Sequence, residues 1–455
     1  MKRAPTWVAG GMGLLAVVAG AALHSPPPGA VQCDVSAADY ATLQAALDAN
    51  PGRTIHVPDG DYEISAKLRL RGDHAVLCGR GRIIQKNPKA PILEIERAAD
   101  VIVRDLVLTR SADAQSSTEP AVVAIDCDGL LLDGVQVVDH RSPAAAIRVS
   151  RGQLCQIRNC RVENYMAISV DDRTSSPDWG YAFKCIDGTG IALDNCRGAL
   201  VQGNRVIERD MLPTPEMQDR HGLGKFVKRA AQKGAIVSQE VWDRGSVDNW
   251  HQGSAIVVTG PRESDCIQII GNYIENAAQG IDLHADHVIV SGNIVNNAFA
   301  GMKAMHGSRH VLIVGNQFIK NDLWAIGLMP GAASSDGRAG EPNYDHGSIV
   351  ASNVISEFGY GNARWIWNGP GRSTSPLWFD AGQKPDNPPL SDVVIQGNVV
   401  YNSAIDQQGG GTSGQPRYRY AVRVSPGQTG PKNLHFFGNL FQPGEEGVAN
   451  VELAP

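Results

Sequence analysis

The chain has 455 residues, of which 42% are hydrophobic and 19% are charged, and its formal net charge is −6. These proportions are typical of an ordered globular protein that can bury a large core. The acidic balance argues against a nucleic-acid-binding protein, which would carry a basic surface.

The first predicted element is a secretory signal peptide over residues 1–30. Lys2 and Arg3 precede an apolar stretch that runs from Trp7 to Leu23 and ends before Pro26. This order of charged, apolar and small residues is typical of a cleaved export signal. We therefore expect a secreted or periplasmic protein that has no membrane association after cleavage, with one domain over residues 31–455.

A short amphipathic helix is predicted next, over residues 37–49. Ser36 followed by Asp39 is a helix-capping pattern, and Pro51 ends the helix. Four residues share its apolar face: Tyr40, Leu43, Ala46 and Leu47. We expect this helix to cap one end of the fold that follows.

The rest of the chain contains a repeat in which a short run of Val, Ile or Leu ends at a Gly-Asn turn. The clearest copies end at Asn204, Asn272, Asn293, Asn316, Asn398 and Asn439. From Asn272 to Asn293 to Asn316 the step is 21 and then 23 residues, a spacing typical of a solenoid. The runs have the alternation of strands. A leucine-rich horseshoe has a Leu-x-x-Leu-x-Leu spacing, which this sequence lacks.

These patterns predict an all-β, single-stranded right-handed parallel β-helix with an N-terminal capping helix and inserted loops. Rungs are expected from about Val101 to Asn439, and the recurring Asn is expected to form a ladder of side-chain hydrogen bonds. Residues 54–62 and 77–81 resemble the opening strand and turn of the pectate-lyase and polygalacturonase superfamily. That superfamily contains lyases, hydrolases and epimerases, so the resemblance implies the fold rather than the reaction.

Four segments interrupt the repeat and predict loops that project from the coil: 208–250, 330–346, 359–390 and 403–418. The first contains Lys225 and Trp250 and a predicted helix over 221–233, and the third contains Arg364–Trp367 and Trp378. Long loops on one face of a solenoid often build its binding site. Aromatic rings stack on sugars and cations pair with carboxylates, which favours an acidic glycan. The alternative is that the aromatic side chains only pack these loops onto the coil.

The eight cysteines leave two alternatives open. In an exported chain, Cys155 with Cys160 and Cys185 with Cys196 are close enough in sequence to be disulfide candidates. The other interpretation is a ladder of buried thiols, because free cysteine packs as a small apolar residue.

The polar residues that carry chemistry lie in the regular rungs. Aligning these rungs on their Gly-Asn turns places one row inward (Ile256, Ile281, Met302 and Ile326) and the next row outward (Val257, Asp282, Lys303 and Gly327). Because rungs are about 4.8 Å apart, Asp282 and Lys303 should approach each other. His284 should face the same way by two-residue alternation. We expect this patch to be flanked by His251, His306 and Arg309, with Arg148 in a comparable row earlier in the coil.

A closer resemblance lies in the segment Gly280-Ile-Asp282-Leu-His284, which is similar to the G-F-D-P-H core of mannuronan C5-epimerases. The resemblance implies that Asp282 and His284 lie in an active groove and that Lys303 and His306 add catalytic polar groups. The sequence departs from the family at Gln279, where the family has a proton-transferring tyrosine, at Leu283 and at Ala285.

These residues suit removal of the proton beside a uronate carboxylate, as in β-elimination or C5 epimerisation. We assign Lys303 or His306 as the base, His284 as the second proton-transfer group and Asp282 as the group that orients them. Arg309 is expected to bind the substrate carboxylate, and His251, Arg148, Trp250 and Lys225 to contact the acidic polysaccharide. A calcium ion held by acids could replace the neutralising cation.

Three alternatives stay open. Asp171 and Asp172 follow a predicted strand at 167–170 and suggest a glycoside hydrolase, which uses paired carboxylates, although Asp is also common where strands end. A non-catalytic glycan-binding surface protein would share the coil and the aromatic residues. Asp282 and Lys303 could also be an ordinary surface ion pair.

Because the predicted helix covers one end of the coil, we expect a monomer.

Overall fold

The computed structural model describes residues 34–260, 263–330, 345–361, 374–382, 388–402, 416–427 and 429–454. The predicted signal peptide and the Arg364–Trp367 segment lie outside these residues. Among the described helices, none has the length and apolar character needed to cross a membrane.

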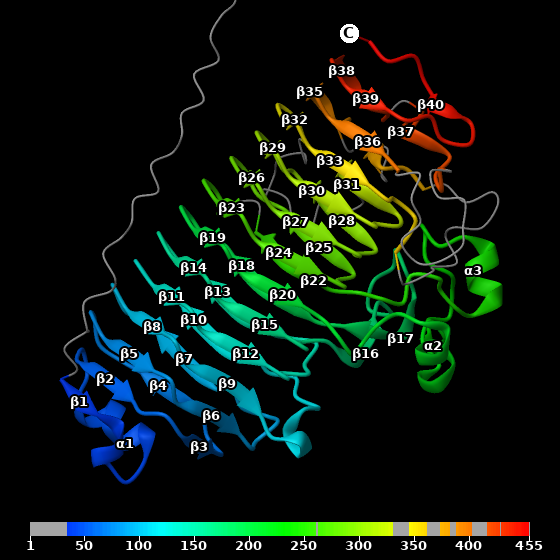
Figure 1. Ribbon diagram of the computed structural model, residues 1–455. Coiled ribbons are helices and arrows are strands. Elements are labelled where there is room, and N and C mark those ends of the chain that lie inside the picture. Colours follow the sequence, from blue (N-terminus) through cyan, green and yellow to red (C-terminus); the bar gives the residue numbers. More distant parts are fainter. Residues whose placement is uncertain are drawn as a thin grey trace, which may run out of the picture. The chain divides into compact units, whose positions relative to one another are not determined.

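The described chain winds into a parallel β-helix, as predicted (Figure 1). Each turn of the chain contributes one strand to each of three long parallel sheets, called here the first, second and third sheets. In all three sheets a strand pairs with strands from the turns before and after it, so neighbours in space lie one full turn apart in sequence.

The first sheet contains β1 (Val35–Ser36), β2 (Thr54–Val57), β5 (Val76–Gly79), β8 (Ile102–Arg104), β11 (Leu131–Asp133), β14 (Gln156–Arg158), β19 (Leu200–Gln202), β23 (Gln268–Ile270), β26 (Ile289–Ser291), β29 (Leu312–Val314), β32 (Ile349–Ala351), β35 (Ser391–Gln396) and β38 (Lys432–Phe437). The second contains β3 (Asp61–Ile64), β6 (Arg82–Gln85), β9 (Val107–Arg110), β12 (Gln136–Val138), β15 (Arg161–Glu163), β20 (Arg205–Ile207), β24 (Tyr273–Glu275), β27 (Ile294–Asn296), β30 (Gln317–Ile319), β33 (Val354–Ser356), β36 (Val399–Tyr401) and β39 (Leu440–Phe441). The third contains β4 (Leu68–Leu70), β7 (Leu93–Glu96), β10 (Val122–Ile125), β13 (Ala145–Ser150), β18 (Thr189–Asp194), β22 (Ser254–Thr259), β25 (Gln279–Leu283), β28 (Ala300–Met305), β31 (Trp324–Met329), β34 (Leu377–Phe379), β37 (Tyr420–Val424) and β40 (Gly447–Ala449).

The core lies inside the coil, where aliphatic side chains from successive rungs stack on one another. In the three-residue strands of the first and second sheets, the middle residue is buried and its neighbours are more exposed, as in β23 and β26. This alternation explains the β-branched runs of the repeat, because each such residue packs against its equivalents one rung above and below.

The predicted asparagine ladder is confirmed. The side-chain amide nitrogen of each ladder residue donates to the side-chain oxygen of the next at 2.9–3.0 Å, through Asn204, Asn272, Asn293, Asn316, Asn353, Asn398 and Asn439. Each amide also donates to a backbone carbonyl of an earlier rung, as Asn293 does to Ile269 at 2.9 Å. The ladder therefore satisfies buried polar groups at the turn between the first and second sheets.

The N-terminal helix is shorter than predicted. Residues 37–49 form a 3₁₀ turn, η1 (Ala37–Asp39), and then the helix α1 (Leu43–Ala49), which is capped by the Thr42 hydroxyl rather than by Ser36. Ser36 caps the 3₁₀ turn instead. Leu43, Ala46 and Leu47 are buried, so the predicted apolar face is confirmed. A second 3₁₀ turn, η2 (Ala112–Ala114), follows β9.

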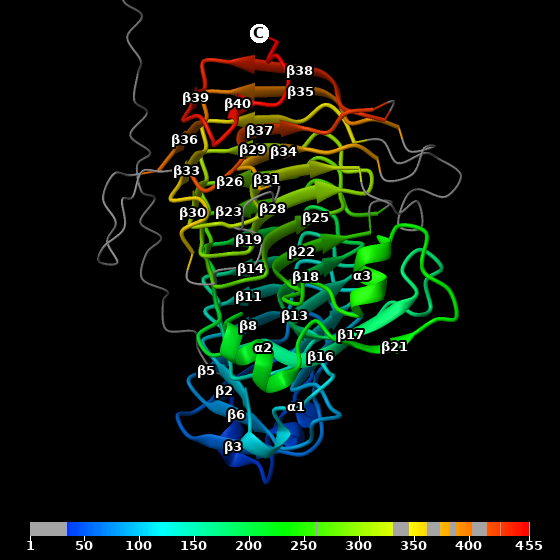
Figure 2. The ribbon, with the colours of Figure 1, turned by 90° about the vertical axis from the view of Figure 1, so that its right-hand side faces the viewer.

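Two long insertions between the second and third sheets combine into one inserted unit beside the coil (Figures 1 and 2). It contains β16 (Ala167–Asp172), β17 (Tyr181–Asp187) and β21 (Phe226–Arg229), which form an antiparallel sheet, and the helices α2 (Pro215–His221) and α3 (Gln239–Arg244).

The predicted helix over 221–233 is wrong, because residues 226–229 form strand β21. Gly222 ends α2 in the left-handed region, and a Cβ at Gly224 would lie 2.5 Å from the Val247 carbonyl oxygen. Phe226 then stacks on Tyr181 of β17, with ring centroids 4.3 Å apart. Contacts with a distant strand therefore override the local helical pattern.

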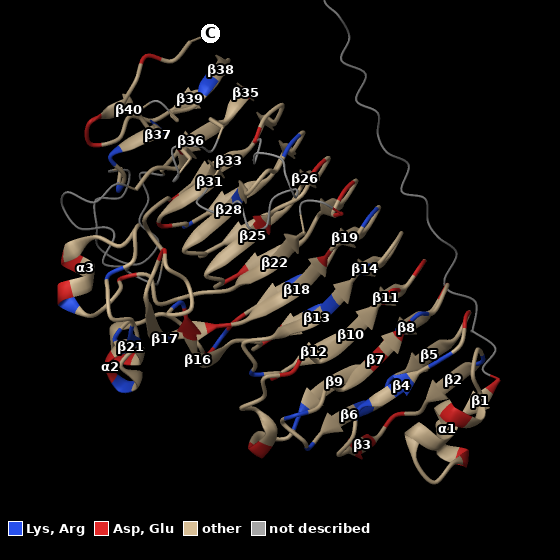
Figure 3. Ribbon diagram, turned by 180° about the vertical axis from the view of Figure 1, so that it is seen from behind, with Lys and Arg blue, Asp and Glu red and all other residues tan. Residues whose placement is uncertain are grey.

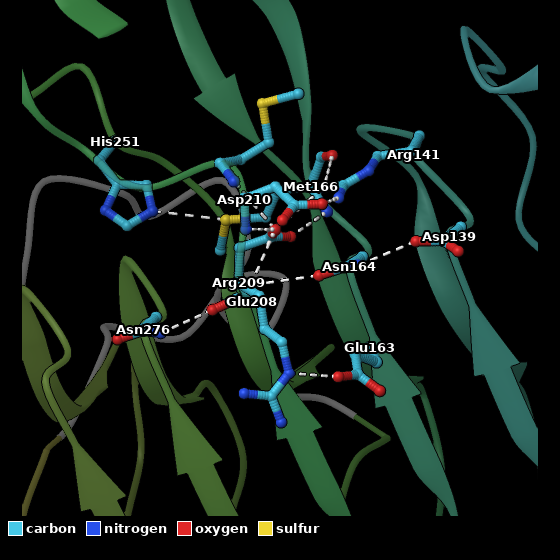
Figure 4. Close-up of polar contacts among 11 residues, drawn as sticks. Asp139, Arg141, Glu163, Asn164, Met166, Glu208, Arg209, Asp210, His251 and Asn276 are labelled. Carbon is cyan, nitrogen blue, oxygen red and sulfur yellow. Dashed lines mark hydrogen bonds and ion pairs between the residues drawn. The ribbon is translucent and has the colours of Figure 1, made fainter. Parts of the chain in front are cut away.

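A buried carboxylate ties both insertions to the coil (Figure 4). Glu208 is fully buried and accepts hydrogen bonds from the Arg141 guanidinium at 2.9 Å and from the Met166 backbone N–H at 3.0 Å. It also accepts from the backbone N–H groups of Arg209, Asp210 and Met211. Met166 begins the first insertion and Glu208 the second, so one side chain fixes both.

The structure decides between disulfides and buried thiols for the four cysteines in question. Cys155, Cys160, Cys185 and Cys196 are buried and are not joined by disulfides. Burial raises the pKa of the Cys155 and Cys160 thiols to about 12. The thiols therefore pack as small apolar residues, and the disulfide interpretation is wrong for these four.

Candidate functional site

One outward row of side chains follows the third sheet along the coil. The strand register pairs Val257 with Asp282, Asp282 with Lys303, and Lys303 with Gly327, and it stacks Ile256, Ile281, Met302 and Ile326 in the adjacent inward row. Both predicted rows are confirmed. The full outward row is Arg69, Glu94, Val123, Arg148, Ala192, Val257, Asp282, Lys303, Gly327, Trp378 and Arg423. Figure 3 shows acidic and basic residues interspersed along these strands.

Asp282 is the centre of a compact polar cluster, called here the Asp282 cluster, which it forms with His284, Lys303 and His306. Its Oδ2 lies 3.3 Å from Nζ of Lys303, and its Oδ1 lies 3.1 Å from Nε2 of His284. The rings of His284 and His306 meet edge to face, with centroids 4.6 Å apart. The structure thus brings together all four residues predicted to be catalytic.

The cluster is more buried than an outward position suggested. The Asp282 side chain is 9% exposed and that of Lys303 is 17% exposed, so the expectation of an exposed surface ion pair is wrong. Burial alone would raise the pKa of Asp282, but Lys303 and His284 outweigh it and hold that pKa below its ordinary value. Asp282 is therefore an ionised carboxylate with little contact with water.

A tight turn positions His306 after β28. His306 adopts φ +56°, in the left-handed region, and the backbone N–H groups of Gly307 and Ser308 donate to Asp345 at 3.0 and 3.1 Å. Burial raises the pKa of Asp345 well above its ordinary value. Asp345 belongs to an insertion that interrupts the repeat, so the rung alignment could not place it beside His306.

Several buried polar atoms in the surrounding third-sheet strands make no hydrogen bond to a described residue. These atoms are Oε1 of Gln279, Nδ1 of His284 and Nε1 of Trp324. Buried polar atoms are usually paired, so such atoms can serve to bind a ligand. Gln279 occupies the place of the tyrosine in the resembled motif, and Trp324 is a residue that the sequence did not indicate.

Aromatic and cationic side chains extend the row beyond Gly327. Trp324 and Trp378 meet edge to face, with centroids 5.6 Å apart, and the Arg423 guanidinium lies 4.1 Å from the Trp378 ring centroid. A Cβ at Gly327 would lie 2.5 Å from Cε of Met329 and 3.1 Å from Nε1 of Trp324. Glycine at this position therefore lets the Met329 and Trp324 side chains lie close to the strand.

Arg309 lies at the corner between the third and first sheets, where its guanidinium is paired with a buried carboxylate. Its Nε donates to Oδ2 of Asp286 at 3.0 Å, and Nη2 contacts the same oxygen. Asp286 is 2% exposed on its side chain. This ion pair gives Arg309 a structural partner within the turn.

His251 and Trp250 are not on the surface where we expected them. Both are buried. Trp250 packs in the hydrophobic core, so this tryptophan packs its loop onto the coil, which was the alternative to a role in binding sugar. Nε2 of His251 lies 3.4 Å from the Met166 sulfur, and burial lowers the pKa of His251 to about 3. His251 precedes β22, whereas His284 follows β25, so the two lie at opposite ends of neighbouring strands.

The remaining predicted contacts are separate from the cluster. Arg148 is in the same outward row, three rungs from Asp282, and its side chain is 50% exposed beside Asp194 at 3.5 Å. Lys225 is exposed in the inserted unit.

Asp171 and Asp172 end strand β16 in the inserted unit, away from the regular rungs. Asp171 pairs with Arg173 at 2.9 Å, and Asp172 accepts from the Thr174 backbone N–H at 3.1 Å. These local partners are those of residues that end a strand. For metals, the described residues contain no group of three or more His, Cys, Asp or Glu side chains that could hold an ion.

Comparisons with known proteins agree with the fold. A family model described as a right handed beta helix region matches residues 104–318. No curated protein matches the chain.

Several solved structures are similar. The catalytic domain of a GH87 α-1,3-glucanase in complex with nigerose has a TM-score of 0.56 at 10% identity; the match covers 93% of this chain and 66% of that one, so this chain spans slightly less than two thirds of it. An exopolygalacturonase from Thermotoga maritima has a TM-score of 0.52 at 10% identity, over 88% of this chain and 86% of that one. A PL6 alginate lyase in complex with a trisaccharide has a TM-score of 0.49 at 12% identity, over 88% and 82%. At 10% identity, the similarity to the glucanase and the exopolygalacturonase establishes the right-handed parallel β-helix and leaves the reaction open.

Proposed function

We propose that this right-handed parallel β-helix protein is a carbohydrate-active enzyme that acts on a uronic-acid-containing polysaccharide. The reaction would be β-elimination by a polysaccharide lyase or the related C5 epimerisation. The Asp282 cluster is the observation that carries the proposal, because it combines an ionised acid, a lysine and two histidines on neighbouring rungs. The glucanase and exopolygalacturonase structures support the polysaccharide class only through a shared fold.

In this proposal each residue has a role that follows from its contacts. Lys303 supplies positive charge to the substrate carboxylate while negative charge builds up beside it. The His284 and His306 pair transfers protons: one ring removes the C5 proton and the other protonates the departing glycosidic oxygen. Asp282 holds Lys303 and His284 in place through its two oxygens.

The electron balance distinguishes the two reactions. In β-elimination the electron pair of the broken C–H bond forms a C4–C5 double bond, and the C4–O bond breaks without consuming water. In epimerisation a proton returns to C5 on the opposite face and the chain stays intact. Both reactions begin with the same proton removal, so the cluster suits either one.

The test is a panel of alginate, pectate, glucuronan and glycosaminoglycans, monitored by absorbance of the unsaturated product. Lyase action gives this absorbance, hydrolysis gives only new reducing ends, and epimerisation changes the C5 configuration without either. A glycan-binding protein gives none of these signals.

Variants locate the site. Lys303→Ala, His284→Ala and His306→Ala should each lower turnover by a factor on the order of 10² or more. Matched controls are Lys432→Ala on the first sheet and His287→Ala, whose ring contacts Asp265 at 2.8 Å as His284 contacts Asp282. Full activity in the three cluster variants would place the reaction elsewhere.

A further inference from the structure

We infer that the polysaccharide extends along the third sheet from the Asp282 cluster toward the N-terminus and that a separate cavity there binds a distal sugar unit of the same chain. This inference rests on the proposed function and adds a second binding site to it. The cavity has a volume of about 710 Å³ and is lined by residues of several rungs, among them Lys67, Lys89, Glu94, Arg148, Ser150 and Asp194.

The cavity and the cluster lie on the same row of the same sheet. Only Ala192 and Val257 separate Arg148 from Asp282 in this row. Three rung steps correspond to about 14 Å, a distance that a short oligosaccharide can span. Neither intervening side chain is large or charged, so the path along this row carries no bulky side chain between the two ends.

A second row beside this path offers polar groups. Ser150, Asp194 and Thr259 are register partners on β13, β18 and β22. Their hydroxyl and carboxylate oxygens can bond sugar hydroxyls along the path. The inserted unit joins the coil just before β18 and β22 and projects from one side of it (Figure 2).

The charges in the cavity suit a sugar that carries hydroxyl groups and a carboxylate. Glu94 contacts both Lys67 and Arg69, the latter at 3.4 Å, so two cations neutralise one acid. The exposed Lys89 has no ion pair with a described residue, and the half-exposed Arg148 is paired with Asp194 at 3.5 Å. Lys89 and Arg148 are therefore the groups best placed to bind a carboxylate of the distal unit.

Calorimetric binding of uronate oligosaccharides of two lengths tests the inference. The probes are disaccharides and octasaccharides of mannuronate and of galacturonate, and a His306→Ala background slows turnover during the titration. Adding Lys89→Ala and Arg148→Ala should weaken octasaccharide binding about tenfold or more, because charge-assisted hydrogen bonds are lost. Disaccharide binding should stay unchanged. The matched control is Arg158→Ala, which removes an arginine paired with Asp133 at 3.2 Å on the first sheet.

The outcomes separate the inference from the proposed function. If octasaccharides bind equally well with and without Lys89 and Arg148, the distal site is excluded while the acidic-substrate proposal stands. If neither length binds in any variant, the proposed function fails and the distal site fails with it. A loss that is equal for both lengths would show that the two residues act near the cluster or through the fold, and it would also overturn the inference.

Discussion

At the scale of single residues, the burial of Asp282 changes what Lys303 does for stability. Removing one partner of a buried ion pair leaves an uncompensated charge, so Lys303→Ala should lower the free energy of unfolding by about 3 kcal/mol. A solvent-exposed pair would lose less than about 1 kcal/mol. Urea unfolding of the variant distinguishes these values.

The double variant Asp282→Asn with Lys303→Met is the control for this prediction. It removes both charges and keeps similar volumes, so stability should return close to that of the unmodified protein while activity stays lost. If Lys303→Ala unfolds at the same urea concentration as the unmodified protein, water screens the pair and the buried-pair prediction is wrong.

Asp187, at the end of β17, should make stability depend on pH. Burial raises its pKa to about 6, above the ordinary value of 3.8. Both the folded and unfolded states are protonated below pH 3.8. As pH rises, the unfolded state ionises first and stability falls until the folded carboxyl also ionises near pH 6.

Asp187→Asn should therefore stabilise the protein at pH 8, by an amount on the order of 2 kcal/mol, and leave it unchanged at pH 3.5. Partial exposure of the carboxyl reduces the effect below the full shift. Asp172→Asn is the control with opposite sign, because hydrogen bonding by Thr174 lowers the pKa of that exposed carboxyl. Thermal unfolding at both pH values would refute the argument if Asp187→Asn gained nothing at pH 8.

At the scale of elements, the asparagine ladder should hold the rungs together. Asn293 is fully buried, accepts from the Asn272 amide and donates to Asn316 and Ile269. Asn293→Ala leaves these partners unsatisfied and should cost about 3 kcal/mol or more. Asn296→Ala, which removes a half-buried amide on β27, should cost less than about 1 kcal/mol in the same denaturation measurement. Equal losses would mean that the ladder adds nothing beyond ordinary packing.

The inserted unit should loosen independently of the coil when its anchor is removed. Glu208→Gln keeps the size of the side chain but removes the charge that faces Arg141. We expect faster proteolysis within residues 208–250 and little change in the hydrogen exchange of the coil strands. The control is Glu163→Gln, which removes a carboxylate paired with Arg161 and Arg209 in β15. Faster exchange across the whole chain would show that Glu208 instead contributes to global stability.

The elements also show what the sequence could and could not predict. The strands, the ladder and the register that places Asp282 beside Lys303 all follow from one repeated Gly-Asn turn. This turn can be recognised from the local sequence alone. Strand β21 could not be predicted in this way, because it pairs with β17 from a different insertion. The burial of Trp250 and the position of Asp345 likewise depend on contacts between segments far apart in sequence.

At the scale of the whole molecule, the net charge and the local site predict opposite effects on the binding of a polyanionic substrate. The formal charge of −6 repels a polyuronate at long range, whereas Lys303, Arg148 and Lys89 attract it at contact. Salt screens both effects, with a Debye length of about 10 Å at 0.1 M ionic strength. The direction in which affinity changes with salt therefore shows which effect dominates.

We expect the local cations to dominate, because a substrate in contact with them lies within a Debye length of their charges. The dissociation constant for a polyuronate should then rise as salt increases, and dextran, a neutral polymer, should bind weakly at every salt concentration. Titration of both polymers at low and high salt measures this. If dextran binds as tightly as the polyuronate at both salt concentrations, the proposal of an acidic substrate is wrong. Tighter polyuronate binding at high salt would show that long-range repulsion outweighs attraction by the local cations.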